Sequence, residues 1–225
     1  QDRSQFFIKR IIGLPGETYD SFANGIDQVI SEGQRHRIQF FNVFVLPNAE
    51  MGDPSYRQEQ GIETIWSPYV FSMDTSRPTR DEVFEQQEMI IATKSMPREE
   101  WIKMRVLAWY TDLLHLNRKL LQIPFIFLHE LAGFTYRKLL ESYLSISLPN
   151  LTILRDIQEF FIDKAKSIQK GEPAYCKVPI TAQGGPEVWF ESNDFVLTGL
   201  IRTQTVESFY AQNLEWLSYL VKQET

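Results

Sequence analysis

Apolar runs of two different periods alternate at the start of the chain. Residues 6–12, FFIKRII, are rich in β-branched and aromatic side chains and end at a Gly-Leu-Pro-Gly turn, a pattern typical of a buried strand. Residues 18–32 carry apolar side chains on one helical face behind Thr18, which suits an N-cap. Residues 38–46, IQFFNVFVL, predict a second strand. Together these segments predict a β-α-β unit with parallel strands.

The middle of the chain loses this pattern, and most of the remainder becomes helical. Proline and glycine punctuate residues 48–81, which are expected to form a long loop that is functional or connects domains. Residues 88–96, EMIIATKSM, can form a strand or the end of a helix that begins at Asp81, and the strand is favoured. A Gly- and Pro-rich passage at residues 171–186 is expected to be irregular. Apolar stripes predict helices at residues 97–121, 124–144, 151–168 and 194–222.

Composition limits which partners the chain is expected to bind and where in the cell it is expected to be. The chain has 225 residues, 43% of them hydrophobic, which can fill the core of one large domain or two small ones. A net charge of -6 and a pI of about 5.2 leave no broad basic surface for nucleic acid. The longest apolar run, IPFIFLHELAGF, is shorter than the roughly 20 residues of a membrane-spanning helix and contains a histidine and a glutamate. We therefore expect a soluble, cytoplasmic protein that binds neither nucleic acid nor membrane.

The two predicted strands end in turns that suit ligand binding. In parallel α/β folds, ligands lie at the carboxyl ends of the strands, and the two ends here read GLPGE and PNAEM. Gly13 and Gly16 let backbone approach a ligand closely, while Pro15 stiffens the turn between them. By itself this turn favours an ordinary tight connection without a ligand. It lacks both the Lys-Ser/Thr pair of a phosphate loop and the GxGxxG pattern.

The pairing of GLPGET with VLPNAEMGDPSYR resembles the late barrel strands of radical S-adenosylmethionine enzymes that carry an N-terminal cobalamin-binding domain. The resemblance covers about residues 6–101 and includes MIIATKSMPREEW. It implies an α/β fold in which the β-α-β unit is the C-terminal portion of a partial TIM-type barrel, followed by a mainly helical domain. The implied domains are residues 1–80, with the late strands and the long loop, and residues 81–225, which are mostly helical.

The resemblance also assigns roles to residues near the strand ends. Ile11, Gly13 and Glu17 match the family's fifth-strand GxIxGxxE segment, although the first glycine is missing and the Gly-to-Glu gap is one residue longer. The expected cofactor-binding residues, which would lie against the adenine of S-adenosylmethionine, are Ile11, Gly13, Gly16, Glu17, Val45, Leu46 and Pro47. The expected substrate contacts, in the second turn and the long loop, are Asn48, Glu50, Tyr56 and Trp66. No catalytic residue and no metal ligand is assigned.

The family's cluster loop is missing from this sequence. A CxxxCxxC motif supplies three thiolates to a four-iron four-sulfur cluster in the family, whereas Cys176 is the only cysteine here. The cobalamin-binding domain is missing as well. We therefore expect this chain to be the C-terminal piece of a parent that uses S-adenosylmethionine, the cluster and cobalamin to methylate an unactivated carbon. The piece itself is expected to bind no cofactor and to be inert.

Other residue types provide no stronger site. His129 and Glu130 are adjacent, so on a helix they point about 100° apart and cannot chelate a metal together. Cys176 has no neighbouring basic cluster and is expected to be structural. The acidic run at residues 85–88 is expected to be solvated surface. Four tryptophans are expected to pack in helical stripes: Trp101, Trp109, Trp189 and Trp216.

Two further interpretations remain open. The chain could be a helical protein-interaction module, with residues 97–222 as a scaffold and residues 48–81 as a docking surface; its stability would then not respond to S-adenosylmethionine. It could also belong to a radical S-adenosylmethionine enzyme without cobalamin, a difference that only the cofactor content of the parent reveals. If the chain is the C-terminal piece of a cobalamin-dependent parent enzyme, its partners are a small-molecule substrate and the rest of the parent. The unpaired edge of a half barrel also predicts self-association.

Overall fold

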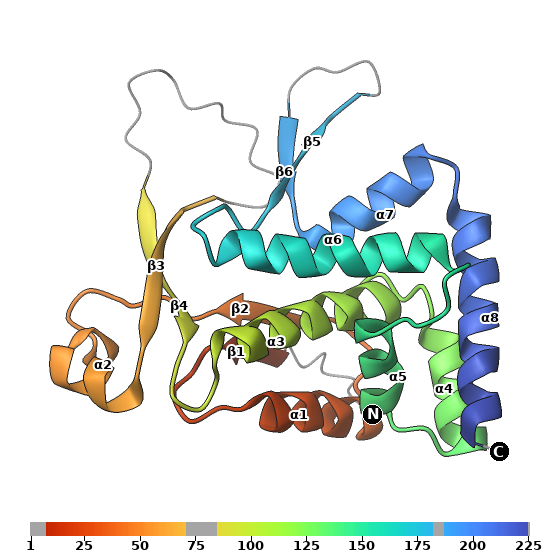
Figure 1. Cartoon of the computed structure of the whole chain (residues 1–225), viewed down its shortest axis with the longest axis horizontal. Helices are drawn as coiled ribbons and strands as arrows, with labels where there is room; N and C mark the ends of the chain where they lie inside the picture. The colour runs from red at the N-terminus through yellow and green to blue at the C-terminus, as the bar shows by residue number, and fades with distance from the viewer. Residues whose placement is uncertain (1–7, 71–84, 182–186, 225) are drawn as a thin grey trace, which may run out of the picture. The chain divides into compact units, whose positions relative to one another are not determined.

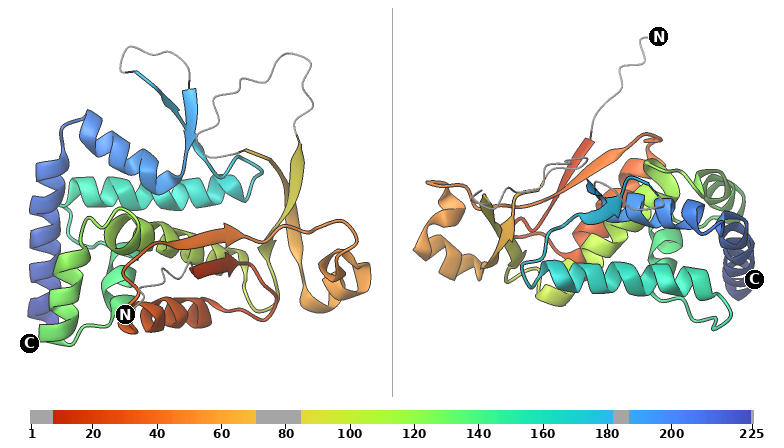
Figure 2. Two further views of the ribbon diagram at one scale, coloured as in Figure 1. Left: turned by 180° about the vertical axis from the view of Figure 1, so that it is seen from behind. Right: turned by 90° about the horizontal axis from the view of Figure 1, so that it is seen from above.

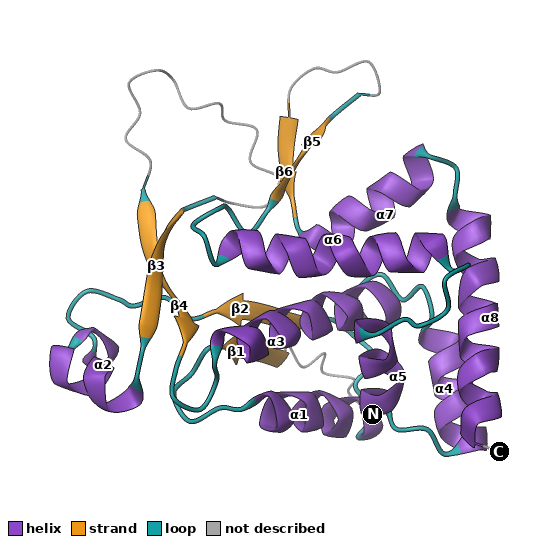
Figure 3. Cartoon of the chain, in the orientation of Figure 1, coloured by secondary structure: helices purple, strands orange, loops and turns teal. Residues whose placement is uncertain are grey.

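The structure is a computed structural model that describes residues 8–70, 85–181 and 187–224 (Figures 1 and 3). It contains two compact units, which we call unit 1 and unit 2. Unit 1 comprises residues 1–65 and 88–140, and unit 2 comprises residues 66–87 and 141–225. This division differs from the boundary expected at residues 80 and 81.

Unit 1 begins with the predicted β-α-β unit. Strand β1 (Ile8–Ile12) pairs in parallel with β2 (Ile38–Asn42), and helix α1 (Tyr19–Ser31) connects them (Figure 2). Thr18 caps α1 in a reciprocal capping box, in which its side chain accepts from the Ser21 N–H and its own N–H donates to Ser21 Oγ. The strands, the helix and the N-cap are therefore confirmed.

The prediction of a long loop over residues 48–81 is wrong for the part that the structure describes. This part contains a short 3-10 helix η1 (Glu50–Gly52), helix α2 (Pro54–Gln60) and strand β3 (Glu63–Pro68). Asp53 caps α2 through bonds from the Ser55 and Tyr56 N–H groups. Proline is tolerated in the first turn of a helix, where its missing N–H would have no partner, so Pro54 marks a helix start here. Residues 71–84 lie outside the described residues.

The strand predicted near residues 88–96 is confirmed as β4 (Gln86–Ala92), which pairs with β3. Residues 43–45 run beside it: the Val45 N–H donates to the Glu88 carbonyl at 2.7 Å, and the Ile90 N–H donates to the Val43 carbonyl at 3.0 Å. Because the Val43 N–H also donates to the Ile12 carbonyl, this residue joins the end of β1 to the middle of β4. The described residues form three two-stranded sheets and no closed barrel.

Four helical segments complete unit 1. Helix α3 (Arg98–Tyr110) continues as a fully buried π-helical segment, η2 (Thr111–Leu116), and is followed by α4 (Gln122–Ala132) and α5 (Tyr136–Glu141). The single helix predicted over residues 124–144 is wrong, because Gly133 adopts a φ of 71° and ends α4. Helix α3 packs against α1 and β1, which explains why residues beyond 81 belong to unit 1.

Unit 2 contains a β-hairpin among its helices. After the 3-10 helix η3 (Ser142–Leu144), α6 (Thr152–Ile168) confirms the helix predicted there. Strand β5 (Cys176–Pro179) lies within residues 171–186, which are expected to be irregular, and pairs antiparallel with β6 (Glu187–Phe190), which follows them. Trp189 therefore lies in a strand, and the prediction that it packs in a helical stripe is wrong.

Two helices take the place of the last predicted helix. They are α7 (Ser192–Arg202) and α8 (Val206–Glu224), and Gln204 between them adopts a left-handed φ of 57°. Polar contacts connect α8 to the start of unit 2: Tyr143 Oη donates to Asn213 Oδ1 at 2.6 Å, and Trp216 Nε1 donates to Ser142 Oγ at 3.1 Å. Burying these groups together satisfies their hydrogen-bonding capacity inside the helical core.

Candidate functional site

The turn after β1, which we call the first exit (residues 13–17), depends on two glycines with different surroundings. Gly13 has a φ of 110°, and a Cβ built there would lie 3.5 Å from the Ile90 carbonyl oxygen and 3.7 Å from the Val43 Cβ. Gly16 has a φ of 88°, and a Cβ built there would meet nothing within 4 Å. Gly13 thus packs the turn onto the neighbouring strands, whereas the backbone at Gly16 has open space beside it.

Side chains from the segment after β4 and from the first turn of α3 hold the first exit and the start of α1. Ser95 Oγ accepts from the Gly16 N–H at 3.0 Å and lies 3.1 Å from Thr93 Oγ1. Glu100 Oε2 accepts from the Tyr19 N–H at 3.1 Å, where α1 begins. Sequence reasoning missed these contacts. The hydroxyls and the carboxylate of ATKSMPREE were the available signal, but nothing local indicated which turn they would contact.

Glu17 ends the first exit with an incompletely paired carboxylate. Its Oε1 atom lies 3.3 Å from Arg10 Nη2, while its Oε2 atom is buried and has no hydrogen-bond partner among the described residues. Burial raises the pKa of Glu17, and the nearby Arg10 guanidinium opposes that shift. A buried carboxylate oxygen without a partner is costly, and such groups are enriched at functional sites. Glu17 therefore suits a ligand that donates a hydrogen bond.

The turn after β2, which we call the second exit (residues 45–51), presents its residues to solvent. Leu46 is 64% exposed, and Pro47, Asn48 and Glu50 are also exposed. Asn48 adopts a left-handed φ of 63°, which asparagine tolerates better than most residues. Because β1 and β2 are parallel neighbours, the first and second exits lie at the same edge of their sheet (Figure 2).

A charged clamp fastens the second exit to β4. Arg57 Nη1 and Nη2 donate to the two carboxylate oxygens of Glu88 at 2.8 and 2.6 Å, and Arg57 Nε donates to the Met51 carbonyl at 3.2 Å. Thr64 Oγ1 adds a bond to Glu88 Oε1 at 2.6 Å. These hydrogen bonds, that from Arg57 first, lower the pKa of Glu88. The prediction of a solvated acidic run is thus wrong for Glu88, because a bidentate pair fixes it.

The other predicted site residues are less closely connected. Ile11 is 41% exposed and lies opposite Phe41 in the β1-β2 register, so both side chains share one face of the pair. Tyr56 is half-buried on α2, next to the clamp residue Arg57. Trp66 lies in β3, belongs to unit 2 and is 61% exposed. The structure therefore brings the two exits together within unit 1, whereas Trp66 belongs to the other unit.

The described residues do not fit an iron-sulfur cluster. They contain no group of three or more His, Cys, Asp or Glu side chains that could hold a metal ion. Cys176 is buried in β5, with its sulfur 3.9 Å from Ser192 Oγ, and burial raises the pKa of its thiol. A neutral, buried thiol is a poor metal ligand.

No helix in the described ranges combines the length and the apolar character that crossing a membrane requires.

Comparison with known proteins connects the chain to methyltransferases. No family model matches it. It is 29% identical over 136 residues to the cobalamin-dependent radical SAM methyltransferase TokK of Streptomyces tokunonensis, covering 60% of this chain and 19% of that protein. It is 28% identical over 96 residues to the 2-(S-pantetheinyl)-carbapenam-3-carboxylate methyltransferase of Streptantibioticus cattleyicolor, covering 43% of this chain and 14% of that protein. The chain thus has partial homology to methyltransferases and matches under a fifth of the length of each.

Proposed function

We propose that this chain is the C-terminal part of a cobalamin-dependent radical S-adenosylmethionine methyltransferase, in which the two exits form part of the adenine-binding edge. The observation that carries the proposal is the partial homology to two methyltransferases, one of them cobalamin-dependent. The parallel β1-β2 pair, with both exits at one edge, supports it because barrel enzymes bind ligands at the carboxyl ends of their strands. The pair would be the fifth and sixth strands of a barrel that the parent completes.

Each exit has a physical role in this proposal. The open backbone at Gly16 lets the flat adenine approach, and Glu17 Oε2 accepts a hydrogen bond from the nucleoside. The exposed Leu46, with the backbone of Val45 and Pro47, supplies an apolar edge. The bound cofactors of the parent supply the hydrogen abstraction and the methyl group, while this chain binds and orients. Asn48, Glu50, Tyr56 and Trp66 would contact the substrate.

The proposal assigns the iron-sulfur ligands to the rest of the parent, because this chain has a single cysteine. Four β-α units of about 25 to 30 residues would separate the cluster loop from β1. The coding sequence ahead of Gln1 is therefore expected to encode CxxxCxxC roughly one hundred residues upstream. An upstream sequence without those thiols would overturn the proposal. Cobalamin in the purified parent would separate it from a radical S-adenosylmethionine enzyme that lacks cobalamin.

A pair of glycine variants tests the first exit itself. Gly16 and Gly33 both have positive φ values, of 88° and 101°, and a Cβ at either meets nothing within 4 Å, so alanine strains both backbones alike. In the parent protein, we expect Gly16→Ala to weaken binding of S-adenosylhomocysteine about tenfold by calorimetry, a change of about 1.4 kcal/mol. Gly33→Ala, at the far end of α1, serves as the control and should bind like wild type. Equal losses in both variants would mean that the first exit does not contact the nucleoside.

A second candidate function, a helical protein-interaction module, is favoured by one surface. Ile123, Phe127 and Leu131 recur every four residues along α4 and are 67%, 59% and 79% exposed. Such an apolar stripe is typical of a helix that packs against a protein partner. If this is the function, Phe127→Ser with Leu131→Ser removes association of the chain, and S-adenosylhomocysteine leaves the melting temperature of wild type unchanged.

A further inference from the structure

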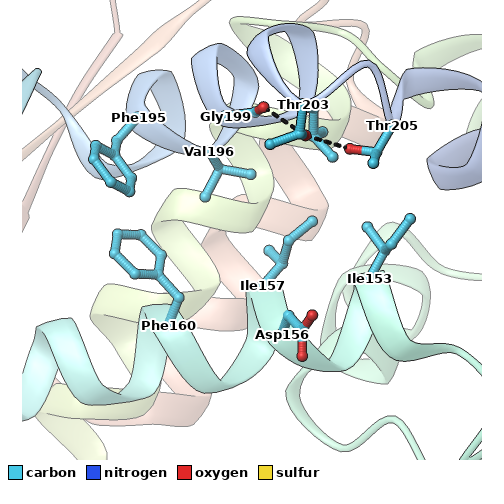
Figure 4. Close-up of a pocket in the computed structure, with 10 residues that line it drawn as sticks. Ile153, Asp156, Ile157, Phe160, Phe195, Val196, Gly199, Thr203 and Thr205 are labelled. Carbon is cyan, nitrogen blue, oxygen red and sulfur yellow. Dashed lines mark hydrogen bonds between the residues drawn. The ribbon is translucent and has the colours of Figure 1, made fainter. Parts of the chain in front are cut away.

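Unit 2 contains an open groove between α6 and α7, remote in sequence from both exits (Figure 4). Its volume is about 390 Å³, within the range of small-molecule sites. Phe160 from α6 and Phe195 from α7 stack at one end, with ring centroids 5.1 Å apart. Between the helices the lining is mainly aliphatic and includes Ile157 and Val196. The groove therefore suits an apolar or aromatic group.

The opposite end of the groove carries two hydroxyls whose protons are already committed. Thr203 Oγ1 donates its proton to the Gly199 carbonyl at 2.8 Å. The bond between Thr203 Oγ1 and Thr205 Oγ1, also 2.8 Å, must then take its proton from Thr205 (Figure 4). Each hydroxyl has a single proton, so neither can donate to a ligand in this arrangement. Both can only accept.

The remaining polar side chain in the lining is a carboxylate. Asp156 on α6 belongs to the lining, is exposed, and makes no ion pair or hydrogen bond with the residues that the structure describes. An ionised carboxylate is an acceptor as well. The polar side chains of the lining, Asp156, Thr203 and Thr205, thus offer acceptors and one negative charge, and no donor.

We propose that this groove binds a small apolar amine, that is, an aryl or alkyl group bearing a protonated ammonium. The aromatic and aliphatic lining would bury the apolar body, and the carboxylate and hydroxyl acceptors would receive the ammonium protons. A carboxylic acid with the same body would face only acceptors and a like charge. This site is separate from the proposed adenine-binding edge and does not depend on it.

Three ligands with the same body and different head groups test the proposal. The probes are 4-phenylbutylamine, 4-phenylbutanol and 4-phenylbutyrate, titrated into the ¹⁵N-labelled 225-residue chain and followed by amide chemical shifts. We expect shifts centred on Gly199, Thr203 and Thr205, with the amine binding about three- to fivefold more tightly than the alcohol, as an exposed ion pair allows. The butyrate should bind most weakly. Equal affinity of amine and butyrate, no binding by any probe, or shifts confined to other residues would each overturn the proposal.

Two variants and one matched control test whether the amine binds in the groove. Asp156→Asn should lower the affinity for the amine about threefold and leave that for the alcohol unchanged, whereas Glu159→Gln, an exposed carboxylate of α6 outside the lining, should change neither. Gly199→Leu should abolish binding of all three probes. A Cβ at Gly199 meets nothing within 4 Å and leucine favours helix, so this variant fills the groove without disturbing the fold. Wild-type binding by a folded Gly199→Leu chain would show that the amine binds elsewhere.

Discussion

Unit 1 and unit 2 form their candidate sites with different interactions. In unit 1, hydrogen bonds between residues far apart in sequence hold the exits: Gly16 bonds to Ser95, and Arg57 bonds to Glu88. In unit 2, the groove is formed by the apolar faces of α6 and α7, and its hydroxyls bond to each other two residues apart. The site of unit 1 therefore depends on ionisable and polar partners, whereas that of unit 2 depends on helix packing.

The two units also differ in their histidines. All three histidines of the chain, at positions 36, 115 and 129, belong to unit 1. His115 is fully buried, with its ring 5.9 Å from that of Phe125 and 4.9 Å from that of Tyr136, and neither ring nitrogen has a hydrogen-bond partner among the described residues. Burial, helped by the positive charges of Arg35 and Lys119, lowers the pKa of His115 from 6.5 to about 4. Unit 1 therefore contains an acid-sensitive group in its core.

Acidification should give the largest difference between the units. Unfolded His115 takes up a proton below about pH 6.5 and the folded residue only near pH 4, so stability falls as pH falls through this window. We expect a loss on the order of 3 kcal/mol in the free energy of unfolding of unit 1, from 1.36 kcal/mol for each pKa unit. Urea unfolding at pH 7 and at pH 4.5 measures it.

Two histidine variants show where this acid sensitivity originates. His115→Leu should remove most of the pH dependence between these values, because leucine does not titrate. His129→Gln should keep it, since His129 is only half-buried and its Nδ1 contacts the Phe134 carbonyl oxygen. An unchanged slope in His115→Leu would place the acid sensitivity in another group.

The clamp on the second exit should give the next largest effect. Glu88→Gln removes a charge-assisted pair and is expected to destabilise unit 1 by about 1.5 to 3 kcal/mol at pH 7. The folded pKa of Glu88 is lowered, so its contribution is present above the unfolded pKa and is lost as pH falls through the folded value. The difference between variant and wild type should thus shrink toward pH 3 in the same urea experiment.

An exposed ion pair provides the comparison for this clamp. Arg98 Nε donates to Glu63 Oε2 at 2.8 Å, with side chains 48% and 53% exposed. Glu63→Gln is expected to cost less than about 1 kcal/mol, because solvent screens such pairs. If both glutamine variants have the same effect, the half-buried clamp has no special role.

The N-cap of α1 should have a smaller effect, still confined to unit 1. Thr18→Ala removes the acceptor for the Ser21 N–H and is expected to cost about 1 kcal/mol. Hydrogen exchange should quicken in the first turn of α1 and stay unchanged in α6. Thr18→Ser keeps the acceptor and should behave like wild type; exchange that changes equally in both variants would argue against the cap.

The smallest expected effect is a stabilisation of unit 2. Gly199→Ala places a methyl group in open space within α7 and is expected to add about 0.5 to 1 kcal/mol, because alanine favours helix over glycine. Gly61→Ala in unit 1 should destabilise, since its φ is 61° and a Cβ there would lie 2.8 Å from Lys94 Cγ. Thermal unfolding of the two variants, followed separately in each unit, shows which substitution raises the stability and which lowers it. A destabilising Gly199→Ala would mean that the groove is not open at this position.

Local patterns in the sequence determined the elements whose formation depends on neighbouring residues. The run FFIKRII, the Thr18 N-cap and the single stripe of α6 predicted β1, α1 and α6, because strand propensity, capping and periodicity act within a few residues. The same reasoning predicted a parallel pair with both exits at one edge. Helix breaks at Gly133 and Gln204 were missed, since each depends on one left-handed residue inside an otherwise helical pattern.

Only the tertiary structure decided what holds the exits and what lines the groove. Ser95 and Gly16 are 79 residues apart, and Glu88 and Arg57 are 31 apart, so no local pattern indicates that they meet. The groove likewise needs α6 and α7 to leave open space beside Gly199, next to two threonines that use their protons on the protein. Propensity is a property of neighbouring residues, whereas a binding surface is a property of which distant side chains the packed core brings together.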